Sequence, residues 1–348
     1  MTKEQGKHSR FLQTAIRLLF AIVIVGGLVW FRKDQLKQCL ESFNYLFVAP
    51  AMLFYFLTNG IAAWRWRKLA QMQNFELSMF EAFSLTMQGN FFSLIIPGGA
   101  IGGDVVKMGL LAKRRRPGTR GEGIFTIFMD RVVGMLALFL LAIVWLVICF
   151  PEISVMKTPY IPLNAFQLKL IVLGVILMCL AGIAAGIAIF FHRFLRRIPG
   201  VGSLMDFCDR RFNQLVSRVC AMADQYAQYP GVLTVLVAIS VFFIHMFSAI
   251  PLCFLIAGTG CELNLPQLIM IMTAVTMGNI AGLIPLTPGG IGLRDLTVIA
   301  ILSAGNISQG TGETAQLMST GLSVIFNLCG GLFFVFDPGR TSSIGAKK

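Results

Sequence analysis

Two short motifs each place a carboxylate after helix-breaking residues, and the backbone amides of such a break could bind an anion. PGGAIGGD occupies residues 97–104 and PGGIGLRD occupies residues 288–295, so matched positions lie 191 residues apart. Consecutive glycines can turn successive backbone N–H groups toward one point, and a helix that starts after the break adds the positive end of its dipole. A phosphate is the natural guest of such a site; alternatively, the glycines only permit close helix packing. The glycines concerned are Gly98, Gly99, Gly102, Gly103, Gly289, Gly290 and Gly292.

Six charged residues flank or interrupt the apolar runs near these motifs. A charge at the centre of a bilayer costs at least ~2.5–3.5 kcal/mol, so such residues usually pair or face water. Neighbours in sequence point in different directions on a helix, so we expect cross-pairing, such as Arg131 with Asp104. We predict that the cations bind an anionic headgroup and that the aspartates orient them, with structural ion pairing as the alternative. The cations are Lys107, Arg131 and Arg294, and the aspartates are Asp104, Asp130 and Asp295.

Uncharged polar residues precede each motif and could line a path between the two. A Gly-Asn pair stands before each break, at residues 89–90 and 278–279, and Thr287 directly precedes the second motif. We expect Asn90, Asn279 and Thr287 to line a polar cavity. Alternatively, they bond neighbouring helices together, at about 0.6–2 kcal/mol per interhelical hydrogen bond.

The remaining polar chemistry is too dispersed for a metal or catalytic site. The 8 cysteines and 3 histidines show no CxxC pair and no metal-ligand spacing. Motifs for a phosphate loop, a zinc protease or a nucleophile elbow are absent from the sequence. We therefore expect no cofactor, no metal and no catalytic residue, and a protein that is not an enzyme.

The chain that must position these residues has the composition of a membrane protein. Of its 348 residues, 56% are hydrophobic and 13% are charged, and the mean hydropathy is +0.76. Residues 170–191 carry no charge and can cross a hydrocarbon layer of roughly 30 Å as a helix. Comparable runs recur along the chain, and residues 11–31 fit a retained first helix better than a signal peptide. The sequence predicts an all-α polytopic membrane protein.

The basic residues give a topology. Cytoplasmic loops collect Lys and Arg, so we expect the basic segments and both termini on the cytoplasmic side of the inner membrane. The net charge of +13 then reports orientation and does not indicate a nucleic-acid partner. Most of the 29 basic residues lie in segments 3–10, 64–68, 107–120 and 193–218 and in the tail from residue 340.

This topology makes two stretches return to the side from which they start. Residues 80–112 begin and end inside, and residues 267–304 begin and end outside, so each predicts a re-entrant hairpin broken at its Pro-Gly-Gly. Residues 1–150 and 151–348 then each form a repeat of helix, helix, re-entrant hairpin, helix, in opposite orientations. Such inverted-topology repeats are typical of transporters. Alternatively, each hairpin is two complete spans.

A cytoplasmic segment of the second repeat has its own pattern. Within residues 203–228, apolar residues recur at steps of three and four, with arginines on the other side. The pattern predicts an amphipathic helix that lies on the inner leaflet. A docking surface for a partner protein is the alternative.

Three sequence stretches together resemble a known family. They are PGGAIGGDVVKMGLLAKRR, GEGIFTIFMDRVVGMLALFLL and IPLTPGGIGLRDLTVIAIL. They are similar to the membrane domain of the lysylphosphatidylglycerol synthase/flippases, which stands alone in YbhN-like proteins. Asp130 and Asp295 stand where that family more often has Glu.

The resemblance implies two re-entrant hairpins and lipid translocation across the inner membrane. The family's synthase members carry a further cytosolic domain, so we do not expect synthase activity of this chain. Relatives handle hopanoid or polyprenol lipids as well as phospholipids, so the resemblance does not name the lipid.

We expect a flippase or transporter for an amphipathic, anionic lipid, working by alternating access, with a homo-oligomer as an open option. The alternatives are a non-transporting membrane anchor for a lipid-synthesis enzyme or glycosyltransferase, and an intramembrane enzyme that acts on a lipid phosphate.

Overall fold

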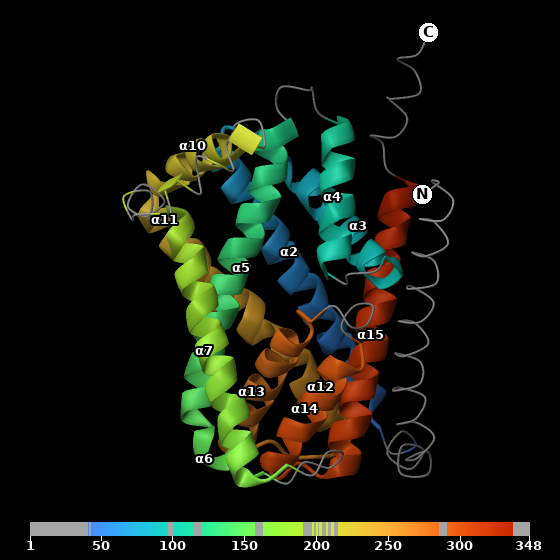
Figure 1. Cartoon of the computed structure of the whole chain (residues 1–348). Coiled ribbons are helices and arrows are strands. Elements are labelled where there is room, and N and C mark those ends of the chain that lie inside the picture. The colour runs from blue at the N-terminus through green and yellow to red at the C-terminus, as the bar shows by residue number, and fades with distance from the viewer. Residues whose placement is uncertain are drawn as a thin grey trace, which may run out of the picture.

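The computed structural model is helical throughout its described part (Figure 1). The residues described are 41, 43–96, 100–114, 120–156, 163–190, 197, 200, 202–203, 207, 210–211, 215–284 and 291–336. Within these ranges the expected all-α fold is confirmed. The predicted first helix, residues 11–31, and the C-terminal tail lie outside them.

Five helices in the described ranges are long and apolar enough to cross a membrane. Their surfaces expose large apolar side chains such as Leu53, Leu177 and Leu328, as expected where lipid replaces water. The span from Pro230 to Gly258 is not a uniform α-helix, because a π-helical segment, Ser240–Met246, separates its ends. The five are η1–α2 (Tyr45–Met72), α5 (Arg120–Ile148), α7 (Ala165–Phe190), α11–α12 (Pro230–Gly258) and α15 (Gln309–Val335).

Two pairs of shorter helices occupy the predicted hairpins. The first pair is α3 (Met79–Ile95) and α4 (Ala100–Arg114), which agrees with the expected range 80–112. The second pair is α13 (Leu265–Ala281) and α14 (Leu293–Ala304), which agrees with 267–304. In each pair the two limbs pack against each other. Figure 1 shows α3 and α4 in the upper half of the molecule and α13 and α14 in the lower half.

The first limb of each hairpin starts with the same kind of cap. The Ser78 hydroxyl accepts a hydrogen bond from the Glu81 amide at the start of α3. At the start of α13, Asn264 and Gln267 form a reciprocal capping box. Each cap satisfies backbone amides that the helix itself leaves without a partner, which fixes where the limb begins.

The two longest apolar helices next to the hairpins each contact both of them. Helix α5 packs against α4 and α13, while α15 packs against α3 and α14. Figure 1 shows α5 and α15 running through both halves of the molecule. The largest buried apolar cluster joins α5, α12, α13 and α14 through residues such as Leu146, Leu255, Ile271 and Leu302. A short helix, α6 (Phe150–Ile153), follows α5.

The amphipathic helix is present as α10 (Leu215–Ala227), and its position on the inner leaflet stays a prediction. Its apolar side packs onto protein, with Ala223 and Tyr226 buried against residues of α2, α5 and α11. The Tyr226 hydroxyl donates to the Leu69 carbonyl at 3.0 Å, and Gln73 Nε2 donates to the Met222 carbonyl at 2.8 Å. Burial raises the pKa of the Tyr226 phenol, so it remains a neutral donor.

Candidate functional site

Asp104 and Arg131 form a two-point ion pair between α4 and α5. Arg131 Nε donates to Asp104 Oδ2, and Nη2 donates to Oδ1 at 2.7 Å. The predicted cross-pairing of these two residues is therefore present. The Asp104 side chain is 11% exposed but that of Arg131 is 46% exposed. Among the described residues Nη1 of Arg131 has no hydrogen-bond partner, so the guanidinium still has donors to offer.

Lys107, one turn after Asp104 on α4, is buried, and no carboxylate of the described residues lies within 4.0 Å of its ammonium. Its Nζ lies 3.7 Å from the centroid of the Trp66 ring and donates to Thr86 Oγ1 at 3.3 Å. Trp66 is held by its own hydrogen bond to Thr126 Oγ1, at 3.0 Å. No acidic side chain in the described ranges forms an ion pair with Lys107. An ammonium has three donors, so this one can bind a further acceptor.

Arg65 completes the first charged cluster, and the sequence interpretation missed it. It was counted in the cytoplasmic basic segment 64–68, yet α2 (Val48–Met72) continues beyond it and buries its side chain. Arg65 Nε donates to Asp130 Oδ1 at 2.8 Å, and Nη2 donates to the Asp130 carbonyl at 3.2 Å. The sequence signal was the apolar pattern that continues through Trp66 and Leu69, which indicates a helix rather than a loop.

The Arg65–Asp130 pair also reaches the π-helical segment of the span from Pro230 to Gly258. Arg65 Nη1 donates to Ser240 Oγ at 2.9 Å, and a ring nitrogen of His245 lies 3.0 Å from the Gly134 carbonyl. A π-helical segment shifts the helix register and often occurs at functional sites. Three helices, α2, α5 and the one that begins at Pro230, are thus joined beside the first cluster.

The second cluster is built around Asp295, which is fully buried at the start of α14. Gln316 Nε2 and Thr320 Oγ1, both on α15, donate to Asp295 Oδ1 at 2.8 and 2.7 Å. The Gly292 amide donates to Oδ2 at 2.9 Å. Neutral donors therefore hold this carboxylate.

Arg294 lies beside that carboxylate rather than away from it, contrary to the expectation for sequence neighbours. Its Nε is 3.5 Å from Asp295 Oδ1, and its Nη2 donates to Thr320 Oγ1 at 3.1 Å. The Nε atom is buried without a hydrogen bond in the described structure. The first turn of α14 brings both side chains to the same face of α15.

The predicted amide sites are only partly described. Gly102 and Gly103 lie in the first turn of α4, where helix amides have no internal partner. Gly103 also packs on α3, because a Cβ there would clash with the Gly89 carbonyl oxygen. The amide of Gly292, a residue with a φ of +98°, is already bonded to Asp295. Gly98, Gly99, Gly289, Gly290 and Thr287 lie outside the described residues, so their roles stay predictions.

Asn90 belongs to a polar strip that joins α2, α3 and α15. Its Nδ2 donates to Asn59 Oδ1 at 2.7 Å, and Asn59 Nδ2 donates to the Tyr55 carbonyl at 2.8 Å. The Tyr55 hydroxyl lies 2.8 Å from Ser319 Oγ, one residue before Thr320. These hydrogen bonds join neighbouring helices, which is the alternative role given for Asn90. Asn279 is half-buried on α13.

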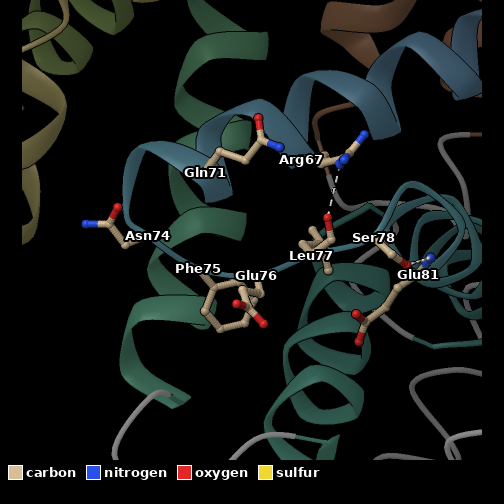
Figure 2. A pocket seen from close by; sticks show the side chains of 8 residues that line it. All are labelled: Arg67, Gln71, Asn74, Phe75, Glu76, Leu77, Ser78 and Glu81. Atoms are coloured by element: carbon tan, nitrogen blue, oxygen red, sulfur yellow. Dashed lines mark hydrogen bonds between the residues drawn. The ribbon is translucent and has the colours of Figure 1, made fainter.

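A hollow opens at the connection between α2 and α3, where none of the predicted site residues lies. Figure 2 shows its walls, where Arg67 Nε donates to the Leu77 carbonyl at 3.1 Å. Its volume is about 710 Å³, and it is open to the outside. One continuous stretch of chain supplies its lining: Arg67, Gln71, Asn74, Phe75, Glu76, Leu77, Ser78 and Glu81. It is separate from both charged clusters, so no headgroup role is assigned to it.

A family model described as "Lysylphosphatidylglycerol synthase TM region" matches residues 18–331. The match includes both hairpins and every residue of the two charged clusters. No curated protein matches the sequence.

Proposed function

Because the chain belongs to the family of lysylphosphatidylglycerol synthase transmembrane regions, we propose that this multi-pass membrane protein is a lipid flippase. Its substrate in this proposal is an amphipathic, anionic lipid that crosses the inner membrane. The headgroup passes through the protein between the hairpins while the acyl chains stay in the bilayer. Both chain termini lie on the cytoplasmic side.

The surplus positive charge of the first cluster carries this proposal. Arg65 is paired with Asp130 and Arg131 with Asp104, whereas Lys107 has no such partner in the described structure. Ionisable groups at membrane depth are costly unless they are paired or hydrated. A buried ammonium with donors to spare therefore favours an anionic guest such as a lipid phosphate.

The packing supports an arrangement of two inverted repeats. Helix α3 packs on α4, α4 on α5 and α5 on α13. In the same way α13 packs on α14, α14 on α15 and α15 on α3, so the two halves have equivalent contacts. The limb contacts agree: Gly89 faces Gly103 and Lys107, while Gly278 faces Arg294 and Val298. Residues 294 and 298 follow 103 and 107 by the same 191 positions that separate the two motifs.

The limb lengths support re-entrant hairpins over pairs of complete spans. Helices α4 and α14, with 15 and 12 residues, extend only about 22 and 18 Å at 1.5 Å per residue. A hydrocarbon core of roughly 30 Å exceeds both lengths. Paired broken helices of this kind place the substrate site of transporters near the midplane, and rocking of one repeat against the other gives alternating access.

Reconstituted liposomes test the proposal. Labelled phosphatidylglycerol should cross faster than labelled phosphatidylcholine in vesicles that contain the protein, and Arg131→Ala should slow the anionic lipid. Lys113→Met, which removes an exposed lysine at the end of α4, is the matched control and should change little. Equal rates for wild type and Arg131→Ala would contradict the mechanism. No lipid movement, together with a co-purifying enzyme that is lost on deletion of residues 203–228, would favour the membrane-anchor alternative.

A further inference from the structure

The surface formed by α4 and α5 combines exposed apolar side chains with a half-exposed arginine. On α5, Ile124, Phe128 and Arg131 are spaced by four and three residues, so they share one face of the helix. Phe128 is 40% exposed and the Arg131 side chain is 46% exposed. On α4, Ile101 and Val105 are more than half exposed. The Arg131–Asp104 ion pair joins the two helices at this surface.

The charge on this face is what sets it apart from a plain lipid-facing surface. Helix α7 also exposes apolar residues, such as Leu177 and Leu180, but it has no charged residue after Lys169 in its own sequence. Arg131 lies about 16 Å along α5 from Arg120 at 1.5 Å per residue, well inside the helix. A cation at that depth must meet an anion or water, and Asp104 occupies only part of its donors.

We propose that a phospholipid of the surrounding bilayer docks sideways on the α4–α5 face, with its phosphate on Arg131 and an acyl chain along Val105 and Ile101, toward the start of α4. This inference rests on the proposed function and deepens it, because it makes this face the lateral entrance for the substrate. The guanidinium binds the phosphate through donors that Asp104 leaves free, and its charge complements the phosphate. The exposed apolar residues keep the acyl chain at the lipid-facing surface, so the phospholipid need not leave the bilayer to be bound.

Asp104 competes with the phosphate for the same guanidinium. The carboxylate orients Arg131 when no lipid is bound, and a phosphate must share or displace it. The docking strength therefore depends on the aspartate as well as on the arginine.

A photo-crosslinking amino acid at position 128 tests the docking directly. The full-length protein is reconstituted in vesicles with equal amounts of phosphatidylglycerol and phosphatidylcholine, and the captured lipids are measured by mass spectrometry. The same amino acid at position 177 of α7 is the control. Normalised to that control, the ratio of anionic to zwitterionic lipid at position 128 should rise about fivefold, the factor for the ~1 kcal/mol that one basic residue contributes.

The variants separate the proposed docking from general lipid contact. Arg131→Gln should return the ratio to that of position 177, and Asp104→Asn should raise it above wild type, since the competing carboxylate is gone. Added inorganic phosphate should leave the ratio unchanged; a loss of enrichment would assign the site to free phosphate and overturn the proposal. Equal ratios at positions 128 and 177 in the wild type would overturn it as well.

This experiment measures binding without transport. Enrichment at position 128 in a protein that moves no lipid would refute the flippase proposal but support the docking face. Lipid movement without enrichment would refute the docking face alone.

Discussion

Asp104 and Asp295 stand at matched positions of the two glycine motifs, and each is bonded to the long helix that follows its hairpin. Asp104 takes a charged partner, Arg131 of α5, whereas Asp295 takes the neutral donors Gln316 and Thr320 of α15. The arginine that binds Asp104 is half-exposed at the surface, whereas Asp295 is completely buried. Equivalent positions in the two hairpins therefore carry different electrostatics.

The difference extends to the positions one turn further on. Lys107 of the first hairpin matches Val298 of the second, and both contact the glycine of the facing limb. The first hairpin therefore has a buried cation, Lys107, at this position. In the second hairpin the position is apolar, and Arg294 balances the charge of Asp295. An anionic headgroup would accordingly be held by the first hairpin, and the second would serve as its neutral counterpart.

The largest expected effect comes from breaking the support beneath the first cluster. Asp130→Ala leaves Arg65 buried without its carboxylate, which should lower the free energy of unfolding by about 3–5 kcal/mol. Thermal unfolding of the detergent-solubilised protein measures this change, with Glu152→Ala at an exposed position as the control. A loss no larger than that of the control would show that the buried pair does not support the fold.

The two matched aspartates should respond differently to loss of charge. Asp295→Asn should cost about 1–3 kcal/mol, because an amide cannot accept all the hydrogen bonds of this enclosed carboxylate. Asp104→Asn should cost less than about 1 kcal/mol, because the guanidinium of Arg131 is half-exposed and a lipid phosphate or water can replace the carboxylate. Equal losses of stability would remove the distinction between the hairpins.

The glycines that seat the limbs test whether the hairpins are tightly packed. Gly103→Ala should destabilise by about 1–3 kcal/mol, since its methyl group would meet the Gly89 backbone. Gly321→Ala on α15 meets no atom within 4 Å and is the control. That substitution should be neutral or slightly stabilising, because alanine has the higher helix propensity. Similar effects at both positions would contradict the close approach of α3 and α4.

The smallest effect on stability should come from Lys107. Lys107→Met keeps most of the side-chain length and removes a buried charge that forms no ion pair in the described structure, so stability should stay within about 1 kcal/mol of wild type or rise. Thermal unfolding measures this change too. A large loss would mean that the ammonium is mainly a structural group.

The breaks between the paired helices could be predicted because their signals are local. Pro together with consecutive Gly residues favours a break, so the end of α3 before the first Pro-Gly-Gly and that of α13 before Pro285 and Pro288 follow from local sequence. The ion pair between Arg131 and Asp104 followed from the cost of a charge in a membrane and from the directions of neighbouring side chains. Both arguments needed only the sequence.

Tertiary contacts explain what the sequence did not reveal. Counting basic residues treated Arg65 as part of a loop, because its partners Asp130 and Ser240 come from distant helices. The contact of Tyr226 of α10 with α2 could not be predicted, because an amphipathic pattern does not tell which neighbour the apolar side meets. Gln316 and Thr320 were passed over since polar residues in a membrane helix carry no sign of the carboxylate they bond.

In our proposal Lys107, which forms no ion pair in the described structure, selects an anionic headgroup. The most direct measurement is the ratio of phosphatidylglycerol to phosphatidylcholine flipping rates in vesicles with wild-type protein and with Lys107→Met. We expect the ratio to fall about tenfold or more in the variant, since a hydrogen bond to a charged group contributes about 1.5–3 kcal/mol. An unchanged ratio in a stably folded variant would show that Lys107 does not select the headgroup.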